Sequence, residues 1–248
     1  MIKFFRRIRE KLISEGKLSR YLLYAIGEIV LVVIGILIAL QINSWNQTQL
    51  DISQEEKFLL EIKENLQEDL EKLDEVLLAN ENKLKRIDTA YHYLSLMEEK
   101  PLYGKQFSFQ LPVITNHKIF TPTVVAFNNL TSTGKIDIFR SDALRKEISR
   151  YYSDTALNGI QNQIISSTQN FLDNVAPKMI NRTMMKSITK KDFNVVPIQE
   201  VQVQRDPKVL AGLFVLINKT MEHNLVLEQT KKKVNGLIGS IDNYLESK

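Results

Sequence analysis

The sequence predicts a mostly α-helical fold. It has one N-terminal transmembrane helix followed by an extracytoplasmic helical bundle with two long antiparallel helices. Three observations lead to this prediction. A long apolar run lies near the N-terminus, positive charge is concentrated before it, and apolar residues recur at steps of three and four through most of the remaining chain. We therefore expect a basic cytoplasmic segment over residues 1–20, a transmembrane helix over 21–42 and an extracytoplasmic domain over 43–248.

The charge of the chain is unevenly distributed. Among 248 residues there are 33 Lys and Arg and 29 Asp and Glu, for a formal net charge of +4. Residues 1–20 hold seven basic and two acidic residues, so they carry +5 and the rest of the chain carries −1. A nearly neutral body argues against a nucleic-acid partner, which would need a basic face. The absence of cysteine excludes disulfides, thiolate metal sites and a cysteine nucleophile.

The apolar run is long enough to cross a bilayer. Residues 21–42 contain one charged side chain, that of Glu28, and about 20 helical residues span the roughly 30 Å of the hydrocarbon core. Tyr21 and Tyr24 at one end and Trp45 at the other are expected interface anchors. A core helix of a soluble protein and a cleaved signal peptide are the alternatives. The length of the run and the lack of a small-residue cleavage site favour a retained anchor.

Basic residues predict the orientation of this span. No Lys or Arg follows it until Lys57, so the positive-inside rule places the N-terminus in the cytoplasm and the domain across the membrane. In a Gram-negative cell this means an inner-membrane anchor and a periplasmic domain. The basic segment either forms an amphipathic helix on the anionic inner leaflet or only orients the span. The residues expected to contact that leaflet are Lys3, Arg6, Arg7, Arg9, Lys11, Lys17 and Arg20.

Two features of the span point to contacts inside the membrane. An ionisable group at the depth of Glu28 costs about 2–3 kcal/mol on insertion scales. Glu28 therefore either pairs within an oligomer or takes part in proton-coupled work with a multi-span partner, or it snorkels toward Arg20 or the lipid headgroups. Gly35 and Ala39, with Gly27 two turns earlier on a similar face, form a stripe of small residues that allows close packing of spans.

The domain over residues 43–248 is predicted to consist of helices separated by short breaks. Residues 54–99 predict one long helix, with Ser53 and Glu56 as its capping box. Residues 106–111 alternate polar and apolar side chains, which predicts a short strand or an extended crossover. A Thr-Pro pair at 121–122 predicts a helix start, and Gly134 predicts the end of that helix.

The second half of the body continues this pattern. An extended link is expected over residues 135–139, and Ser141 is expected to cap a helix that runs to about residue 176, weakened at Gly159. Residues 179–188 suggest a short helix, and 189–205 a loop with a short strand. Asp206 and Pro207 then predict the start of a last helix that reaches the C-terminus. Its length matches that of the first body helix, which favours an antiparallel pair.

Two blocks of sequence resemble a known family. Residues 1–47 contain YAIGEI and LIALQIN followed by Trp-Asn, and residues 120–152 read FTPTVVAFNNLTSTGKIDIFRSDALRKEISRYY. Both are similar to the DUF6090 family of bacterial membrane proteins. The resemblance implies a single-pass inner-membrane protein with a mostly helical extracytoplasmic domain. It implies no established enzyme activity and no catalytic residues.

No motif for catalysis, cofactor binding or metal binding occurs. His92, His117 and His223 share no helical turn, and we expect them at surface or interface positions. We therefore predict an interaction or scaffold protein of the cell envelope without a cofactor. Its partners would be the lipid bilayer and either further copies of itself or an envelope protein. The alternative is a periplasmic ligand-sensing or enzymatic domain that acts with a membrane partner.

Overall fold

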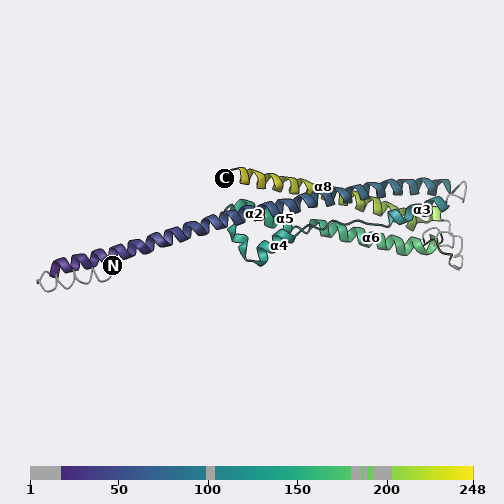
Figure 1. Ribbon diagram of the computed structural model, residues 1–248. Coiled ribbons are helices and arrows are strands. Elements are labelled where there is room, and N and C mark those ends of the chain that lie inside the picture. Colours follow the sequence, from purple (N-terminus) through teal and green to yellow (C-terminus); the bar gives the residue numbers. More distant parts are fainter. Residues whose placement is uncertain (1–17, 99–103, 180–185, 187–188, 193–202, 248) are drawn as a thin grey trace. The chain divides into compact units, whose positions relative to one another are not determined.

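The fold is helical throughout the described residues. The computed structural model describes residues 18–98, 104–179, 186, 189–192 and 203–247, and no strand occurs among them. The chain divides into two units, Met1–Lys57 and Phe58–Lys248. The elements in chain order are α2 (Leu18–Leu96), α3 (Gly104–Ile114), α4 (Val125–Ser132), the 3-10 helix η2 (Lys135–Ile138), α5 (Asp142–Tyr152), α6 (Ala156–Met179), the 3-10 helix η3 (Val203–Arg205) and α8 (Pro207–Glu246) (Figure 1).

In the first unit, the described residues all belong to α2. Its large apolar side chains over residues 22–42 are between 47% (Val33) and 77% (Leu23) exposed. They are therefore not packed in a protein core, as those of a soluble core helix would be. The stretch is long and apolar enough for one membrane crossing.

The helix α2 does not begin at the capping box predicted by Ser53 and Glu56. It starts at Leu18 and runs unbroken through both residues. The reason is that neither Gly nor Pro occurs between residues 36 and 100, and an interior Ser costs only a few tenths of a kcal/mol of helix stability.

In the second unit, α2 and α8 are the two long helices, and they run antiparallel. Near one end of the unit, Lys63 on α2 forms an ion pair with Asp242 on α8 at 2.5 Å. Near the other end, the hydroxyl of Tyr91 donates to the backbone oxygen of Leu210 at 2.9 Å. Residue numbers thus rise along α2 while they fall along α8, as Figure 1 also shows. The predicted pair of long antiparallel helices is confirmed.

Buried side chains on both long helices recur at alternating steps of three and four. This spacing keeps one face of each helix against its neighbours over many turns. On α2 from residue 58 onward, the buried residues are Leu59, Ile62, Leu66, Asp69, Leu73, Val76, Asn80, Lys83, Ile87, Ala90 and Leu94. On α8 they are Val209, Leu213, Leu216, Thr220, His223, Leu227, Thr230, Val234, Leu237 and Ile241.

The helix α6 lies antiparallel to α8 and close to it. Lys219 on α8 donates to Gln163 on α6 at 2.7 Å, and Lys178 near the end of α6 pairs with the α8 cap, Asp206. A Cβ at Gly212 of α8 would lie 2.6 Å from the ring of Phe171 on α6. The close approach of these two helices therefore requires glycine at position 212.

The core consists of two apolar clusters. One joins α2 and the second half of α8 to α4, α5 and the first turns of α6, with Leu66 and Leu227 among its buried members. The other joins α2, the first half of α8 and the end of α6 to α3, with Phe107 and Leu213 among its fully buried members.

The predicted strand over residues 106–111 is wrong, since these residues lie in α3. Phe107, Leu111 and Ile114 are buried together because they recur at helical steps of four and three. Polar and apolar side chains do alternate over residues 106–111, but the segment is helical, so the helical period decides which side chains reach the core.

The helix predicted to start at Thr121 begins instead at Val125, and its N-cap, Val124, makes no side-chain cap bond. The backbone of Thr123 is bound by Asp69 of α2, which holds this stretch outside the helix. Gly134 follows the helix with a φ of 66°, as predicted for a residue that ends it. The predicted extended link that follows is the 3-10 helix η2.

Two predicted helix starts are confirmed. Ser141 accepts from the backbone N–H of Leu144 and caps α5, and Asp206 accepts from the N–H of Lys208 and caps α8. The single helix predicted to run from Ser141 to about residue 176 is wrong, because it breaks after Tyr152. There Asp154 accepts from the N–H of Ala156 and begins α6.

The predictions over residues 177–205 lie largely outside the described residues. The part that is described at the end of this stretch, Val203–Arg205, is a 3-10 helix and not a strand.

Candidate functional site

The interface anchors predicted from the sequence lie at the two ends of the apolar stretch of α2. Tyr24 is 59% exposed and Trp45 is 66% exposed. The basic residues up to Lys17 lie outside the described residues, and nothing is described of the side chains of Arg20 and Tyr21. The anchor and inner-leaflet assignments therefore stay predictions.

The small residues of the span lie on open surface. A Cβ added to Gly27 or Gly35 would meet nothing within 4 Å, and Ala39 is exposed. Glu28 is half-buried on the same helix. The predicted packing of spans through this stripe stays a prediction, as does the role of Glu28.

In the second unit, residues 116–124 form a segment without secondary structure between α3 and α4, here called the strap. The backbone groups of such a segment need partners outside a helix or sheet. Asp69 on α2 supplies two acceptor contacts, from the backbone N–H of Thr123 at 2.7 Å and from its hydroxyl at 2.8 Å. Lys72 also donates to that hydroxyl, at 2.7 Å.

Two further buried side chains hold the strap. The amide of Gln161 on α6 accepts from the N–H of Phe120 at 2.6 Å and donates to its carbonyl at 3.1 Å. Lys83 on α2 donates to the carbonyl oxygen of Asn116 at 3.2 Å. The buried polar residues Asp69, Lys83 and Gln161 thus bind the strap, which explains why the core tolerates them.

Asp69 also joins the strap to a pair of tyrosines. Its second oxygen accepts from the hydroxyl of Tyr151 on α5 at 2.6 Å. Burial, and then the hydrogen bond to Asp69, raises the pKa of Tyr151. Burial likewise raises the pKa of Tyr152, whose ring stacks on Phe127 at 4.4 Å between centroids. Both phenols stay neutral at physiological pH, so they fit a structural role better than that of a base or nucleophile.

A polar layer separates the two apolar clusters. It consists of Asn80 and Lys83 on α2 with Thr220 and His223 on α8, all buried. The amide of Asn80 lies 3.0 Å from Nδ1 of His223 and donates to Asn224 at 2.7 Å. Since an amide nitrogen only donates, Nδ1 accepts and the imidazole proton is on Nε2. That nitrogen is buried without a partner in the described protein.

The electrostatics of this layer favour neutral groups. Burial, and then the charge of Lys83, lowers the pKa of His223 to about 4. Burial lowers the pKa of Lys83 to about 8. From the sequence we expected His223 at a surface or interface position, but it is 0% exposed and lies in the core. An imidazole so enclosed reaches no substrate, and the layer instead resembles the polar core positions that set the register of packed helices.

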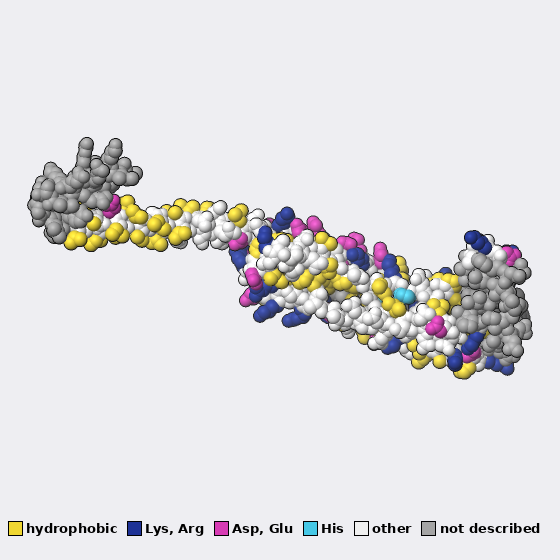
Figure 2. Space-filling model, turned by 90° about the horizontal axis from the view of Figure 1, so that it is seen from below, with side chains coloured by type: hydrophobic (Ala, Val, Ile, Leu, Met, Phe, Trp, Pro, Cys, Tyr) yellow, Lys and Arg dark blue, Asp and Glu magenta, His cyan; other side chains and the backbone are white. Residues whose placement is uncertain are grey.

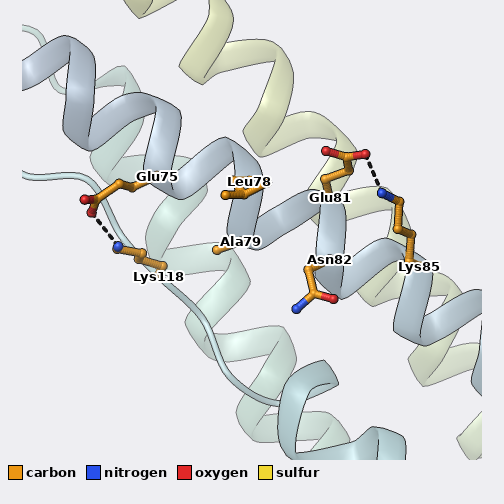
Figure 3. Close-up of a pocket in the computed structure, with 7 residues that line it drawn as sticks. All are labelled: Glu75, Leu78, Ala79, Glu81, Asn82, Lys85 and Lys118. Carbon is orange, nitrogen blue, oxygen red and sulfur yellow. Dashed lines mark hydrogen bonds and ion pairs between the residues drawn. The ribbon is translucent and has the colours of Figure 1, made fainter.

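The outer face of α2 carries a shallow depression of about 540 Å³ (Figure 3). Its charged side chains pair with one another, Glu75 with Lys118 at 2.6 Å and Glu81 with Lys85 at 2.7 Å. These hydrogen bonds from lysine lower the pKa of both carboxyl groups. Leu78 between the pairs is 68% exposed. Such an arrangement is a solvated surface rather than an acid–base pair aimed at a substrate.

No group of three His, Asp or Glu residues in the described parts of the chain converges to hold a metal ion. The residues that sequence reasoning missed are Asp69, Lys83 and His223. Their signal was present, since each is a polar residue at a step of three or four from apolar core positions.

Comparison with known proteins identifies a family. A family model described as a family of unknown function, DUF6090, matches residues 28–198, from within the apolar stretch of α2 to beyond α6. No curated protein and no solved structure matches the chain.

Proposed function

The chain belongs to DUF6090, a family of unknown function, and we propose that it is a membrane-anchored interaction or scaffold module of the bacterial cell envelope. One N-terminal helix holds it in the inner membrane with the N-terminus in the cytoplasm. The helical domain lies in the periplasm and presents its surface to a protein partner.

The observation that carries this proposal is the exposed apolar surface of α2 over residues 22–42. Covering one large apolar side chain is worth about 1.5–3 kcal/mol, and every such residue in this stretch is at least 47% exposed. Lipid is the environment that covers an apolar helix on all sides. The +5 charge that precedes it supports the inward orientation of the N-terminus.

The second unit favours interaction over catalysis. Its buried Asp69, Lys83 and Gln161 bind the strap, and the charges of the α2 depression are paired. A ligand-sensing or enzymatic domain needs an enclosed apolar pocket with convergent polar groups. Exposed apolar side chains on α8, such as Phe214, Met221 and Leu225 at 57–61% exposure, instead suit protein contacts.

Reporter fusions test the location. A phosphatase that is active only outside the cytoplasm, fused after Lys248, is expected to be active, and a reporter that folds only in the cytoplasm is expected to be silent there. Neutralising the basic residues of the first twenty and adding lysines after Trp45 should reverse both signals. A stably expressed but inactive phosphatase fusion on the parent chain would overturn the orientation.

Affinity purification in mild detergent tests the interaction role. The full chain is expected to retain protein partners, further copies included, that a control of residues 1–57 fused to an unrelated soluble domain does not retain. Recovery of the full chain as a monomer without other proteins, or of the same proteins with both baits, contradicts the role.

A further inference from the structure

The polar layer interrupts the apolar core of the second unit on all three of its longest described helices. Gln161 of α6 lies level with the layer residues of α2 and α8, because Gln163, two residues later, bonds Lys219 of the antiparallel α8. The face drawn in Figure 2 mixes charged, polar and apolar side chains, whereas the layer is internal. Its polar residues are at most 4% exposed: Asn80, Lys83, Gln161, Thr220 and His223.

The two apolar clusters end on opposite sides of this layer. On α2 the buried members of one cluster end at Val76, and those of the other begin at Ile87. On α8 the corresponding limits are Leu227 and Leu216. Each gap is about 16 Å long at 1.5 Å per helical residue. Two separate apolar cores therefore lie along one pair of continuous helices.

We call the part built around the cluster with Leu66 the α5 half and the part built around the cluster with Phe107 the α3 half. The layer between them adds little to the free energy that holds them together. Nε2 of His223 is buried without a partner in the described protein, and the buried ammonium of Lys83 is bonded to a neutral carbonyl oxygen. Buried polar groups in such surroundings cost free energy rather than supply it.

The two halves are held unequally. Among the described residues, the cluster of the α3 half has 12 buried members and that of the α5 half has 18. The α5 half also contains Asp69, which bonds both Thr123 and Tyr151 and so ties α2, the strap and α5 together. Because the stability of a part of a fold rises with the apolar surface that it buries, the α3 half is the weaker of the two.

We propose that the α3 half opens as a cooperative unit, with the polar layer as its boundary, while the α5 half stays folded. Opening separates α3, the end of α6, the start of α8 and the end of α2, and it uncovers Phe107 and Leu213. The domain thereby has two states with different surfaces to offer a partner. That consequence rests on the proposed interaction role, whereas the opening itself does not.

Hydrogen exchange of the full chain in mild detergent, followed by mass spectrometry of its peptides, tests the opening. Protection of residues 104–114, 207–216 and 87–94 should share one value, at least about 30-fold below that of residues 142–152, 226–241 and 62–76. The comparison along α2 is the sharpest, because it places the boundary within one continuous helix. Equal protection on both sides of the layer, or a gradual decline toward the helix ends, would overturn the proposal.

A pair of conservative variants on α2 gives a second, independent test. Ile62 and Ile87 are both 0% exposed and lie in the α5 and α3 halves respectively. Ile62→Val should lower protection of the α5 half about fivefold and leave the α3 half within about 1.5-fold, because the packing of Ile62 is kept when only the α3 half opens. Ile87→Val should lower protection of both halves about fivefold, because its packing is lost in either opening.

A domain that opens only as a whole would respond to both variants alike, with equal losses in the two halves, and that result would contradict the proposal. Circular dichroism of each variant checks that the helices are intact. Neither exchange measurement depends on the membrane orientation or on a partner. A failure here therefore removes only the two-state opening, whereas failed reporter fusions or affinity purification remove the proposed function and leave the opening in place.

Discussion

The carboxylate of Asp69, fully buried on α2, accepts a 2.6 Å hydrogen bond from the phenol of Tyr151 on α5. The same carboxylate accepts two bonds from Thr123 of the strap. One side chain therefore joins three segments that lie far apart in the sequence. A buried charge is tolerated when hydrogen bonds satisfy its oxygens, and Asp69 meets that condition.

Replacement of Asp69 should destabilise the domain. Asp69→Ala leaves the hydroxyl of Tyr151 and the N–H of Thr123 without their acceptor, at a cost of about 3 kcal/mol. Tyr151→Phe removes one of the bonds and should cost about 1–2 kcal/mol. Urea unfolding of the full chain in mild detergent, followed by circular dichroism, measures both. Glu71→Ala on the exposed side of α2 should stay within about 0.5 kcal/mol, and an equally small effect of Asp69→Ala would contradict the assignment.

Stability should fall as the pH falls from 6.5 to about 4 because of His223. The pKa of this imidazole is about 4 in the folded protein against 6.5 as its ordinary value. The unfolded chain binds the proton more readily over this window, so protonation favours unfolding, by about 3 kcal/mol in all. His223→Leu should flatten the stability profile between pH 6.5 and 4.5, whereas the exposed His92→Gln should leave it unchanged. Parallel profiles for all three chains would refute a buried neutral His223.

Lys83 should depress stability at neutral pH. Its pKa is lowered from 10.5 to about 8 by burial, so the folded state holds its proton less tightly than the unfolded state. Stability is expected to rise with pH between 8 and 10.5. Lys83→Met removes the buried charge and should stabilise the domain at pH 7 by about 2 kcal/mol, after the loss of the bond to Asn116.

The control for this prediction is Lys85→Met, since Lys85 is exposed on the same helix. It should change the free energy of unfolding by less than about 0.5 kcal/mol. If Lys83→Met destabilises the domain, the ammonium contributes more through its bond to the strap than its desolvation costs.

Two glycines of α8 should respond oppositely to alanine. Gly212→Ala places a Cβ 2.6 Å from the buried ring of Phe171 and should destabilise by about 1–2 kcal/mol, even after the gain in helix propensity. Gly236→Ala meets nothing within 4 Å and should stabilise by about 0.5–1 kcal/mol. Thermal unfolding curves compare the two variants directly. A stabilising Gly212→Ala would mean that α6 and α8 lie farther apart.

Local sequence signals predicted the helix boundaries that are set by bonds between residues close together in the chain. Asp206 before Pro207, Ser141 before α5 and Gly134 after α4 all act as expected, because a cap is a bond between near neighbours in sequence. The same logic failed at Thr121 and Pro122. There the backbone is held by Asp69, more than fifty residues away, and no local pattern reports such a partner.

For the polar residues of the candidate site, the sequence likewise indicates their direction but not their partners. The step of Asn80 and Lys83 from the apolar residues of α2 indicates that they face inward. That Asn80 meets His223, and that Lys83 meets the strap, depends on how α2, α8 and the strap come together.

The sequence by itself determined the helical class, the apolar stretch of α2 and the asymmetry of charge around it. These follow from periodicity and composition, which act over a few turns of one helix. Only the tertiary structure decided that the helix α3 stands where a strand was predicted, and that buried Asp69, Lys83 and Gln161 hold the strap. It also decided that a polar layer separates the two apolar clusters. Burial and hydrogen bonding between distant residues depend on the packing of whole helices, and that packing is a property of the assembled core.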